Sequence, residues 1–367
     1  MSDDAAVAAP SKVDAYRCPR CGADTTFKPG ADALVCVHCG NVEPITARDE
    51  HIVEHDFQAA LADRDHRSVS ELAPNGREVV CKNCGARTVT TRHADRCPFC
   101  DAALVVEVES SPTTIVPESV LPFAITTEDA AEKFRAWLQS RWFKPFGLLK
   151  RAKRDGMDGV YLPYWTYDSA TTTRYRGERG EHYYVTEHYT DSQGKSQTRQ
   201  VQHTRWYSAS GVVDVPFDDV LVCGTTSLPM KIIDSLEPWG LEELKPFDGK
   251  YLAGFTAECA RVPLADGFTV AEAKMDPAIR STIRRDIGGD EQRIHSMAVR
   301  HANVTFKHVL LPLWISCFRD GDQVFRVTVN ARTGEVAGER PWSTGKIVLL
   351  ILFACAIIAV ILYFRQR

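Results

Sequence analysis

Four Cys-x-x-Cys pairs within the first hundred residues constrain this chain more than any other feature of its sequence. They fall into two tetrads, which are Cys18, Cys21, Cys36 and Cys39, then Cys81, Cys84, Cys97 and Cys100. Two sulfurs three residues apart can reach one tetrahedral ion from a tight turn, and a second such turn after a short hairpin completes the shell. This spacing is typical of a zinc ribbon. We therefore expect two structural zinc ions, each held by one tetrad.

Glycine follows the second cysteine in three of the pairs, at Gly22, Gly40 and Gly85, where the turn needs a positive φ. A disulfide framework is the rival interpretation, but it belongs to oxidising compartments, and nothing resembling a signal peptide precedes the cysteines. A redox Cys-x-x-Cys would follow a strand of a βαβ unit and would not come in sets of four. Four cysteines close the shell, although His38 is an alternative ligand in the first site. The single cysteines are expected to be buried small hydrophobes: Cys223, Cys259, Cys317 and Cys355.

The opposite end of the chain predicts a membrane anchor. Residues Ile347 to Phe364 form a run of eighteen residues without a charge. At 1.5 Å per residue such a helix is about 27 Å long, which is just enough for a bilayer core. We expect one C-terminal transmembrane helix over residues 347–364 with residues 365–367 as its tail, which would make a tail-anchored, single-pass protein of the cytoplasmic membrane. Charge counts do not orient the span, but zinc thiolates need a reducing compartment and so place the N-terminal bulk in the cytoplasm.

Between these ends the sequence predicts a mixed body that contains both helices and strands. Residues 183–189, 198–207 and 323–330 are strand-like runs, and Gly194 between the first two is typical of a hairpin turn. Thr126 and Asp129 resemble the capping box of an amphipathic helix. Residues 270–301 are expected to be helical, with a break at Gly288-Gly289. The fold class is therefore α+β, with two small N-terminal four-cysteine zinc ribbons and one transmembrane helix.

These patterns divide the chain as follows: a disordered N-terminus at 1–15, zinc ribbon 1 at 16–46, a helical linker at 47–76, zinc ribbon 2 at 77–107, a linker at 108–125, an amphipathic helix and basic segment at 126–157, and a β-rich α+β domain at 158–341. Within the last domain the pattern V-x-L-P-x-W occurs at Val160–Trp165 and again at Val309–Trp314. This repetition indicates two related β units, although chance explains so short a match equally well.

No signature of a known catalytic site is found in the sequence. It has no G-x-x-x-x-G-K-[ST], H-E-x-x-H, G-x-S-x-G or G-x-G-x-x-G, so no catalytic activity is expected. The net charge is −4, a poor balance for a nucleic-acid binder, and the thiolates of two zinc centres would make it more negative.

For three groups of residues the sequence leaves two interpretations open. His51, His55 and His66 form either a third metal site or a set of surface histidines, of which the second is favoured. The basic cluster at 150–154 either binds anionic headgroups or belongs to a solvated helix face. Ordinary strand or core positions are also the simpler interpretation for the remaining candidate acids and bases: Asp168, Glu178, Glu181, His182, His188, His203, His301 and His308.

Six longer motifs lie in the body: V-Y-L-P-Y-W-T-Y-D (160–168), G-E-R-G-E (177–181), T-R-W-Y (204–207), R-R-D-I-G-G-D-E-Q-R-I-H-S (284–296), T-F-K-H-V-L-L-P-L-W-I-S (305–316) and N-A-R-T-G-E-V-A-G-E-R-P (330–341). Together with the two ribbons they resemble a family of bacterial TFIIB-type zinc ribbon-containing membrane proteins, often labelled "primosomal protein N′ (replication factor Y), superfamily II helicase". The sequence departs from that label because it lacks a nucleotide-binding loop. The resemblance implies that the eight paired cysteines bind zinc. It also implies partners such as flotillin-like scaffold proteins or envelope-stress proteins.

Two functional hypotheses follow. The first is a membrane-anchored zinc-ribbon adaptor without catalytic activity, which presents its zinc modules and its α+β domain to a protein partner at the cytoplasmic membrane face. The alternative is a nucleic-acid-binding or replication-linked zinc-ribbon protein without ATPase activity, as the family label suggests. An enzyme built on the β-rich domain is a third possibility.

Overall fold

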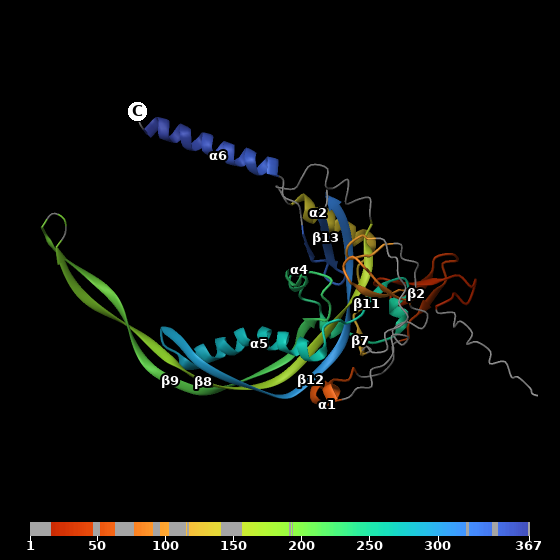
Figure 1. Ribbon diagram of the computed structural model, residues 1–367, viewed down its shortest axis with the longest axis horizontal. Helices are drawn as coiled ribbons and strands as arrows, with labels where there is room; N and C mark the ends of the chain where they lie inside the picture. Colours follow the sequence, from red (N-terminus) through yellow and green to blue (C-terminus); the bar gives the residue numbers. More distant parts are fainter. Residues whose placement is uncertain are drawn as a thin grey trace, which may run out of the picture.

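The structure is a computed structural model of the 367-residue chain. It describes residues 16–46, 52–62, 77–90, 96–102, 115, 117–140, 156–190, 192, 194–320, 323–339 and 344–365. Within these residues the fold is α+β and rich in strands, as expected (Figure 1). The expectations for residues 1–15, for the basic cluster at 150–154, and for His51 and His66 fall outside the described residues.

Two long strands form the axis of the molecule. Strands β8 (Asp158–Thr190) and β12 (Glu291–Asp320) pair antiparallel over most of their lengths, with Leu162 opposite Leu311 near the centre of the body. Residues 160–167 are all buried, because this part of β8 is covered on both faces. From residue 171 to 177 buried and exposed residues alternate, as expected where one face meets solvent.

Shorter strands extend the sheet on both sides of this pair, in the order β10-β7-β12-β8-β11-β6-β5. Their bounds are β5 (Arg77–Val80), β6 (Arg87–Thr90), β7 (Ser119–Val120), β10 (Lys245–Pro246) and β11 (Thr256–Glu258). Four further strands pair outside this path: β4 (His55–Asp56), β9 (Ser196–Cys223), β13 (Gln323–Asn330) and β14 (Val336–Gly338). Four short helical turns connect the elements: α1 (Phe57–Ala62), α4 (Met230–Asp234), η2 (Leu241–Glu243) and η3 (Gly249–Leu252).

The body consists of two structural repeats around the V-x-L-P-x-W motifs. Each repeat runs strand, helix, strand, strand: β7, α2 (Thr127–Gln139), β8 and β9, then β11, α5 (Leu264–Ile287), β12 and β13. Pairing with β9 begins at Tyr164↔Cys223, and pairing with β13 begins at the corresponding Leu313↔Asn330. These matching registers favour the interpretation of two related units over chance.

The hydrogen bonds around each motif repeat as well. Gly224 N donates to Pro163 O at 2.8 Å, and Ala331 N donates to Pro312 O at 3.1 Å. Both motif tryptophans donate to the backbone just before a helix, Trp165 Nε1 to Val262 O and Trp314 Nε1 to Ile125 O, each at 3.0 Å. The two halves are therefore related by an approximate twofold axis between Leu162 and Leu311.

Both four-cysteine modules are built into this body. Module 1 is a three-stranded sheet of β1 (Thr25–Lys28), β2 (Ala33–Cys36) and β3 (Val42–Pro44). Its Phe27 packs on Tyr251, with ring centroids 5.3 Å apart, and Phe27 N donates to Ala253 O at 2.8 Å. In module 2 the strands β5 and β6 continue the central sheet through β11, and Phe99 is fully buried in the body. The modules thus contribute to the core.

Beyond the body, β8, β9 and β12 continue as a curved arm, with α5 lying on its concave side (Figure 1). The buried residues of α5 follow a helical stripe that includes Ala271, Met275, Ile279 and Ile283. Gly267 lets this helix approach closely, because a Cβ there would lie 2.4 Å from Tyr167 Oη. At the other helix, α2, the predicted capping box of Thr126 and Asp129 is confirmed.

The strand-like runs at 183–189, 198–207 and 323–330 are confirmed as parts of β8, β9 and β13, and Gly194 lies in the turn between β8 and β9 with a φ of 80°. The expectation of helix over 270–301 is wrong in its second half. The helix ends at Ile287, and from Glu291 the chain is strand β12. Pairing with β8 determines this outcome, because tertiary contacts override weak local helical propensity.

Helix α6 (Thr344–Arg365) covers the segment predicted to cross a membrane. Large apolar side chains described along it are exposed, among them Ile351, Phe353 and Phe364. Within the described residues, however, no helix is long and apolar enough to qualify as a membrane span. The predicted transmembrane helix over residues 347–364 is therefore not supported.

Replacing Phe99 with alanine tests whether module 2 and the body share one core. The variant Phe99→Ala should lower the free energy of unfolding of the whole chain by about 3 to 5 kcal/mol, because a fully buried aromatic ring is lost. The measurement is urea denaturation followed by tryptophan fluorescence. As a control, Val37→Ala removes a side chain that is 77% exposed and should change the free energy by about 0.5 kcal/mol or less. An unchanged body transition in Phe99→Ala would show that module 2 unfolds on its own.

Candidate metal centres

Each Cys-x-x-Cys pair lies in the same turn. The amide of the fourth residue after the first cysteine donates back to that cysteine's carbonyl, as in Gly22 N to Cys18 O at 2.8 Å. The same bond recurs from Gly40 to Cys36 at 3.0 Å, from Gly85 to Cys81 at 2.7 Å and from Asp101 to Cys97 at 2.9 Å. All four of these donors have positive φ, between 57° and 73°. Asp101 therefore adopts the conformation that glycine adopts in the other three turns.

The turns bring the cysteines together in the two predicted tetrads. In module 1 the Sγ atoms of Cys18 and Cys39 are 3.5 Å apart, and those of Cys21 and Cys36 are 3.4 Å apart. In module 2 the corresponding separations are 3.6 Å for Cys81 and Cys100 and 3.7 Å for Cys84 and Cys97. All eight cysteines are free thiols, which excludes a disulfide framework.

These separations fit a single tetrahedral ion at the centre of each cluster. Metal–sulfur bonds of about 2.3 Å at tetrahedral angles place neighbouring sulfurs about 3.8 Å apart. In each cluster the four sulfurs lie within 4.8 Å of one another and are able to hold a metal ion. His38 does not belong to the first cluster, and its side chain is exposed. A shell of four sulfurs leaves no coordination position for water or substrate, so the chemistry it supports is structural.

Hydrogen bonds from neighbouring amides and thiols lower the pKa of one cysteine in each cluster. In module 2 the hydrogen bond from Cys97 lowers the pKa of Cys84 to about 5, while the pKa of Cys97, the donor, is raised. In module 1 the backbone amide of Cys39 lowers the pKa of Cys36 to about 6. The lowered pKa values favour the thiolate forms of Cys36 and Cys84, and a divalent ion needs thiolates as ligands.

The two clusters differ in exposure. Cys21 is exposed and Cys39 is half-buried in module 1, and Val37 in the same turn is exposed. In module 2 three ligands are buried, and the body supports the second turn directly. Arg326 Nε of β13 donates to Phe99 O at 2.6 Å, and Cys317 Sγ of β12 lies 3.0 Å from Pro98 O. Cluster 2 is therefore the more rigidly held of the two.

The other predicted residues take structural positions. Cys223 and Cys259 are buried as expected, but Cys317 is half-buried beside module 2, and Cys355 on α6 is exposed, so the prediction is wrong for these two. His55 pairs with Glu118 at 3.1 Å. Glu181 pairs with Arg179 at 2.9 Å.

A group of three carboxylates at the base of the arm is close enough to hold a cation: Asp168, Asp218 and Asp219. The ammonium of Lys307 lies 2.7 Å from Asp219 Oδ1 and 3.1 Å from Glu54 Oε1, and it supplies positive charge there. This group therefore serves to fix β4 and the end of β9 to β12.

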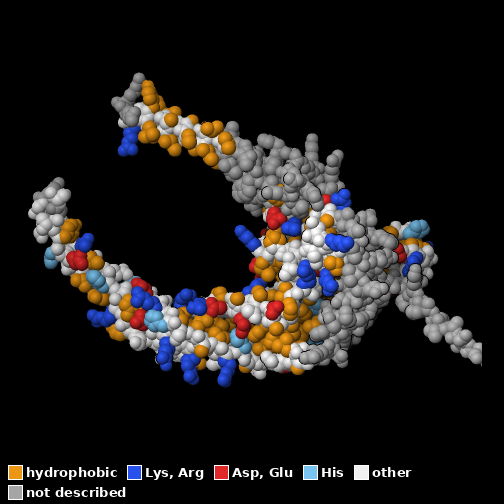
Figure 2. All heavy atoms as spheres, in the orientation of Figure 1, with side chains coloured by type: hydrophobic (Ala, Val, Ile, Leu, Met, Phe, Trp, Pro, Cys, Tyr) orange, Lys and Arg blue, Asp and Glu red, His pale blue; other side chains and the backbone are white. Residues whose placement is uncertain are grey.

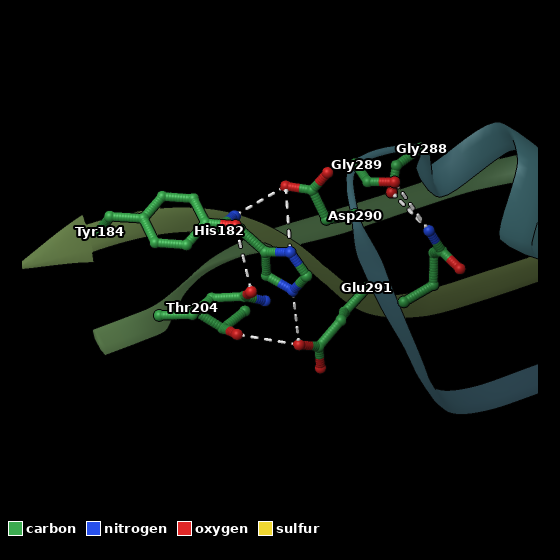
Figure 3. A network of polar contacts seen from close by, with 9 residues as sticks. His182, Tyr184, Thr204, Gly288, Gly289, Asp290 and Glu291 are labelled. Atoms are coloured by element: carbon green, nitrogen blue, oxygen red, sulfur yellow. Dashed lines mark hydrogen bonds and ion pairs between the residues drawn. The ribbon is translucent and has the colours of Figure 1, made fainter. Parts of the chain in front are cut away.

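His182 ties the start of β12 to the arm (Figure 3). Its backbone amide donates to Asp290 Oδ2 at 2.7 Å, and its Nε2 lies 2.8 Å from Glu291 Oε1. Thr204 Oγ1 of β9 donates to the same Glu291 oxygen at 2.8 Å, and these hydrogen bonds, that from His182 first, lower the pKa of Glu291. The network holds the Gly288-Gly289 turn in place. This supports the interpretation of His182 as an ordinary strand histidine.

Sequence reasoning missed a buried acid beside module 2. Glu258 of β11 is 2% exposed; its Oε1 accepts hydrogen bonds from Thr225 Oγ1, at 2.5 Å, and from Ser227 Oγ. Its Oε2 has no hydrogen-bond partner among the described residues. Burial raises the pKa of Glu258 to about 7. In the first repeat the corresponding residue is Leu121, so a comparison of the two repeats would have revealed this polar position.

Removing two ligands of cluster 2 should remove one ion. The double variant Cys97→Ser, Cys100→Ser should hold one metal ion per chain instead of two, measured by elemental analysis after gel filtration. Cys355→Ser, which changes an exposed cysteine outside both clusters, is the control and should keep two ions. Retention of two ions by the double variant would contradict the assignment.

The raised pKa of Glu258 predicts a pH dependence of stability. Because its folded-state pKa lies above the usual 4.5, the folded state binds this proton more tightly than the unfolded state. The resulting stabilisation is complete below pH 4.5 and is lost as the pH rises through 7. Between pH 5.5 and 7.5 the wild type should therefore lose about 2 kcal/mol of stability relative to Glu258→Gln. Denaturation midpoints measured across this range test this, with Glu128→Gln as an exposed control; parallel curves for wild type and Glu258→Gln would refute it.

Comparison with known proteins found no matching family model and no matching solved structure. The chain is similar to the uncharacterized protein YdjG of Bacillus subtilis (strain 168), with 27% identity over 335 residues. The aligned region covers 90% of this chain and 91% of that protein, so the similarity extends over most of both chains. The chain is therefore a distant homologue of YdjG that carries two four-cysteine clusters consistent with zinc ribbons.

Proposed function

We propose that this protein is a zinc-ribbon adaptor without catalytic activity, which presents its body to a protein partner at the cytoplasmic face of the membrane. The two clusters each bind one structural zinc ion. Four thiolates in tetrahedral arrangement are a donor set that zinc prefers, and the sulfur separations of 3.4 to 3.7 Å suit one ion per cluster.

One observation carries this proposal: the two metal sites have no open coordination position, and the modules that hold them pack into the core of the body. Cluster 2 lies at the end of the sheet through β6 and β11, and cluster 1 packs its sheet on the body through Phe27. Metal sites with a reactive role keep an open position and a path for substrate, whereas these sites contribute to folding. Their role in the adaptor is to hold a large, rigid binding body together.

Attachment to the membrane is assigned to α6. The described large apolar side chains of this helix are exposed, and its surface is almost wholly apolar in the space-filling view (Figure 2). An exposed apolar surface of this size marks a contact with lipid or with another protein. We assign the contact to lipid because the helix has no polar face of its own, as its small hydrophobic asymmetry shows.

Capture of the full-length protein from native membranes tests this proposal. The protein is purified in mild detergent with and without nuclease treatment, beside a chain that lacks residues 344–367. We expect the full-length chain in the membrane fraction with companion proteins that persist through nuclease, and the shortened chain in the supernatant. The proposal fails if both chains fractionate alike, or if nucleic acid is the main companion and the proteins leave with it.

A further inference from the structure

Three arginines share the outer face of the arm, on the side away from α5. We call Arg174 and Arg176 of β8 and Arg300 of β12 the arginine face. Their neighbours in the strands point the other way, because Tyr175 Oη donates to Asp286 of α5 at 2.5 Å and His301 Nε2 lies 3.4 Å from Glu272 of the same helix. Successive side chains of a strand alternate between faces, so all three arginines point to the convex side. In Figure 2 several Lys and Arg side chains project from this margin.

These arginines have no partner within the described part of the chain. All three are exposed, and none makes an ion pair, a hydrogen bond or a ring contact there. Elsewhere on the arm arginines are paired: Arg179 with Glu181 at 2.9 Å, and Arg199 with Glu187 at 2.9 Å. Three like charges grouped on one sheet face repel one another and cost some stability. No ion pair or hydrogen bond among the described residues accounts for their position on this face.

The surroundings of the arginine face leave it open to a ligand. On β9 the exposed residues Val212 and Ser210 lie opposite Arg174 and Arg176, and Ala298 lies opposite Arg174 on β12. Arg174 and Arg176 are two residues apart on one strand, which separates them by roughly 7 Å. That distance equals the repeat of side chains along one face of an extended peptide. Carboxylates at alternating positions of such a peptide would match the guanidinium groups.

The length of the positive surface limits the kind of partner. At one end Asp214 lies opposite Thr172, and its Oδ1 accepts a hydrogen bond from Thr172 Oγ1 at 2.7 Å. At the other end Glu178 follows Arg176 on the same face and pairs with Arg293 at 3.7 Å. A nucleic-acid strand that ran along the arm would meet these carboxylates after a few phosphates, and the chain as a whole carries a net charge of −4. A short acidic segment avoids this repulsion.

We propose that the arginine face binds a short acidic segment of a partner protein, in extended conformation, with carboxylates at alternating positions. This gives the proposed adaptor a partner-binding surface and rests on that function only for its biological setting. Binding here requires no membrane and no change in metal content, so the two proposals can fail separately.

Binding of a fluorescent nine-residue peptide, Gly-Ser-Asp-Ser-Asp-Ser-Asp-Ser-Gly, to the full-length protein tests the inference by anisotropy at low salt. The same peptide with Asn in place of Asp is the uncharged control and measures binding that does not depend on carboxylates. The face variant is Arg174→Ser, Arg176→Ser, Arg300→Ser. A matched control on the opposite face of the same arm has the same change in charge: Arg179→Ser, Arg199→Ser, Arg205→Ser.

We expect the wild type to prefer the Asp peptide, the face variant to bind it at least about tenfold more weakly, and the control to stay within about twofold. The face variant should also be at least as stable as the wild type in urea, which separates lost binding from lost folding. Equal binding of the Asp and Asn peptides, or equal loss in both triple variants, would overturn the inference. So would tighter, face-dependent binding of a single-stranded 12-mer DNA or of phosphatidylserine vesicles, because the partner would then be of another class.

Discussion

The antiparallel pairing of β8 with β12 is the interaction on which the rest of the structure depends. It places the two V-x-L-P-x-W motifs opposite each other, with Leu162 against Leu311. On the outer edge of each strand the same register then positions a short parallel strand, β11 beside β8 and β7 beside β12. Two helices follow these short strands, and two longer strands complete the halves. One pairing register therefore determines the position of both repeats.

The metal modules are attached to this symmetric framework in different ways. Module 2 extends the sheet from β11, so the backbone hydrogen bonds of the body continue to within a few residues of its cysteines. Module 1 adds no strand to the sheet of the body; Phe27 packs among Tyr251 and Phe255, and its amide donates to Ala253 O. In both cases an ion bound in the cluster would stabilise the body as well as the small module. The beginning of the chain thus contributes to a core that is formed by strands far along the sequence.

Sequence reasoning predicted the local features and missed those that depend on pairing over long distances. Cysteine spacing identified both clusters, and the capping residues Thr126 and Asp129 placed α2, because the determinants lie within a few residues of each other. The strand after Gly289 was predicted as helix, since its partner β8 lies more than a hundred residues away. Burial of Glu258 and exposure of Arg174 depend likewise on which strand each residue faces. The repeated V-x-L-P-x-W motif was visible in the sequence, but only the matching strand registers showed that it marks two structural repeats.

The central claim is that the metal sites and the body fold as one unit. Hydrogen–deuterium exchange of the full-length protein, followed by mass spectrometry before and after metal removal by a chelator, tests it most directly. The account predicts that metal removal accelerates exchange in residues 16–46 and 77–102, and also in β11 and in residues 160–165 of β8. Faster exchange confined to the cysteine modules, with unchanged protection in β11 and β8, would contradict it.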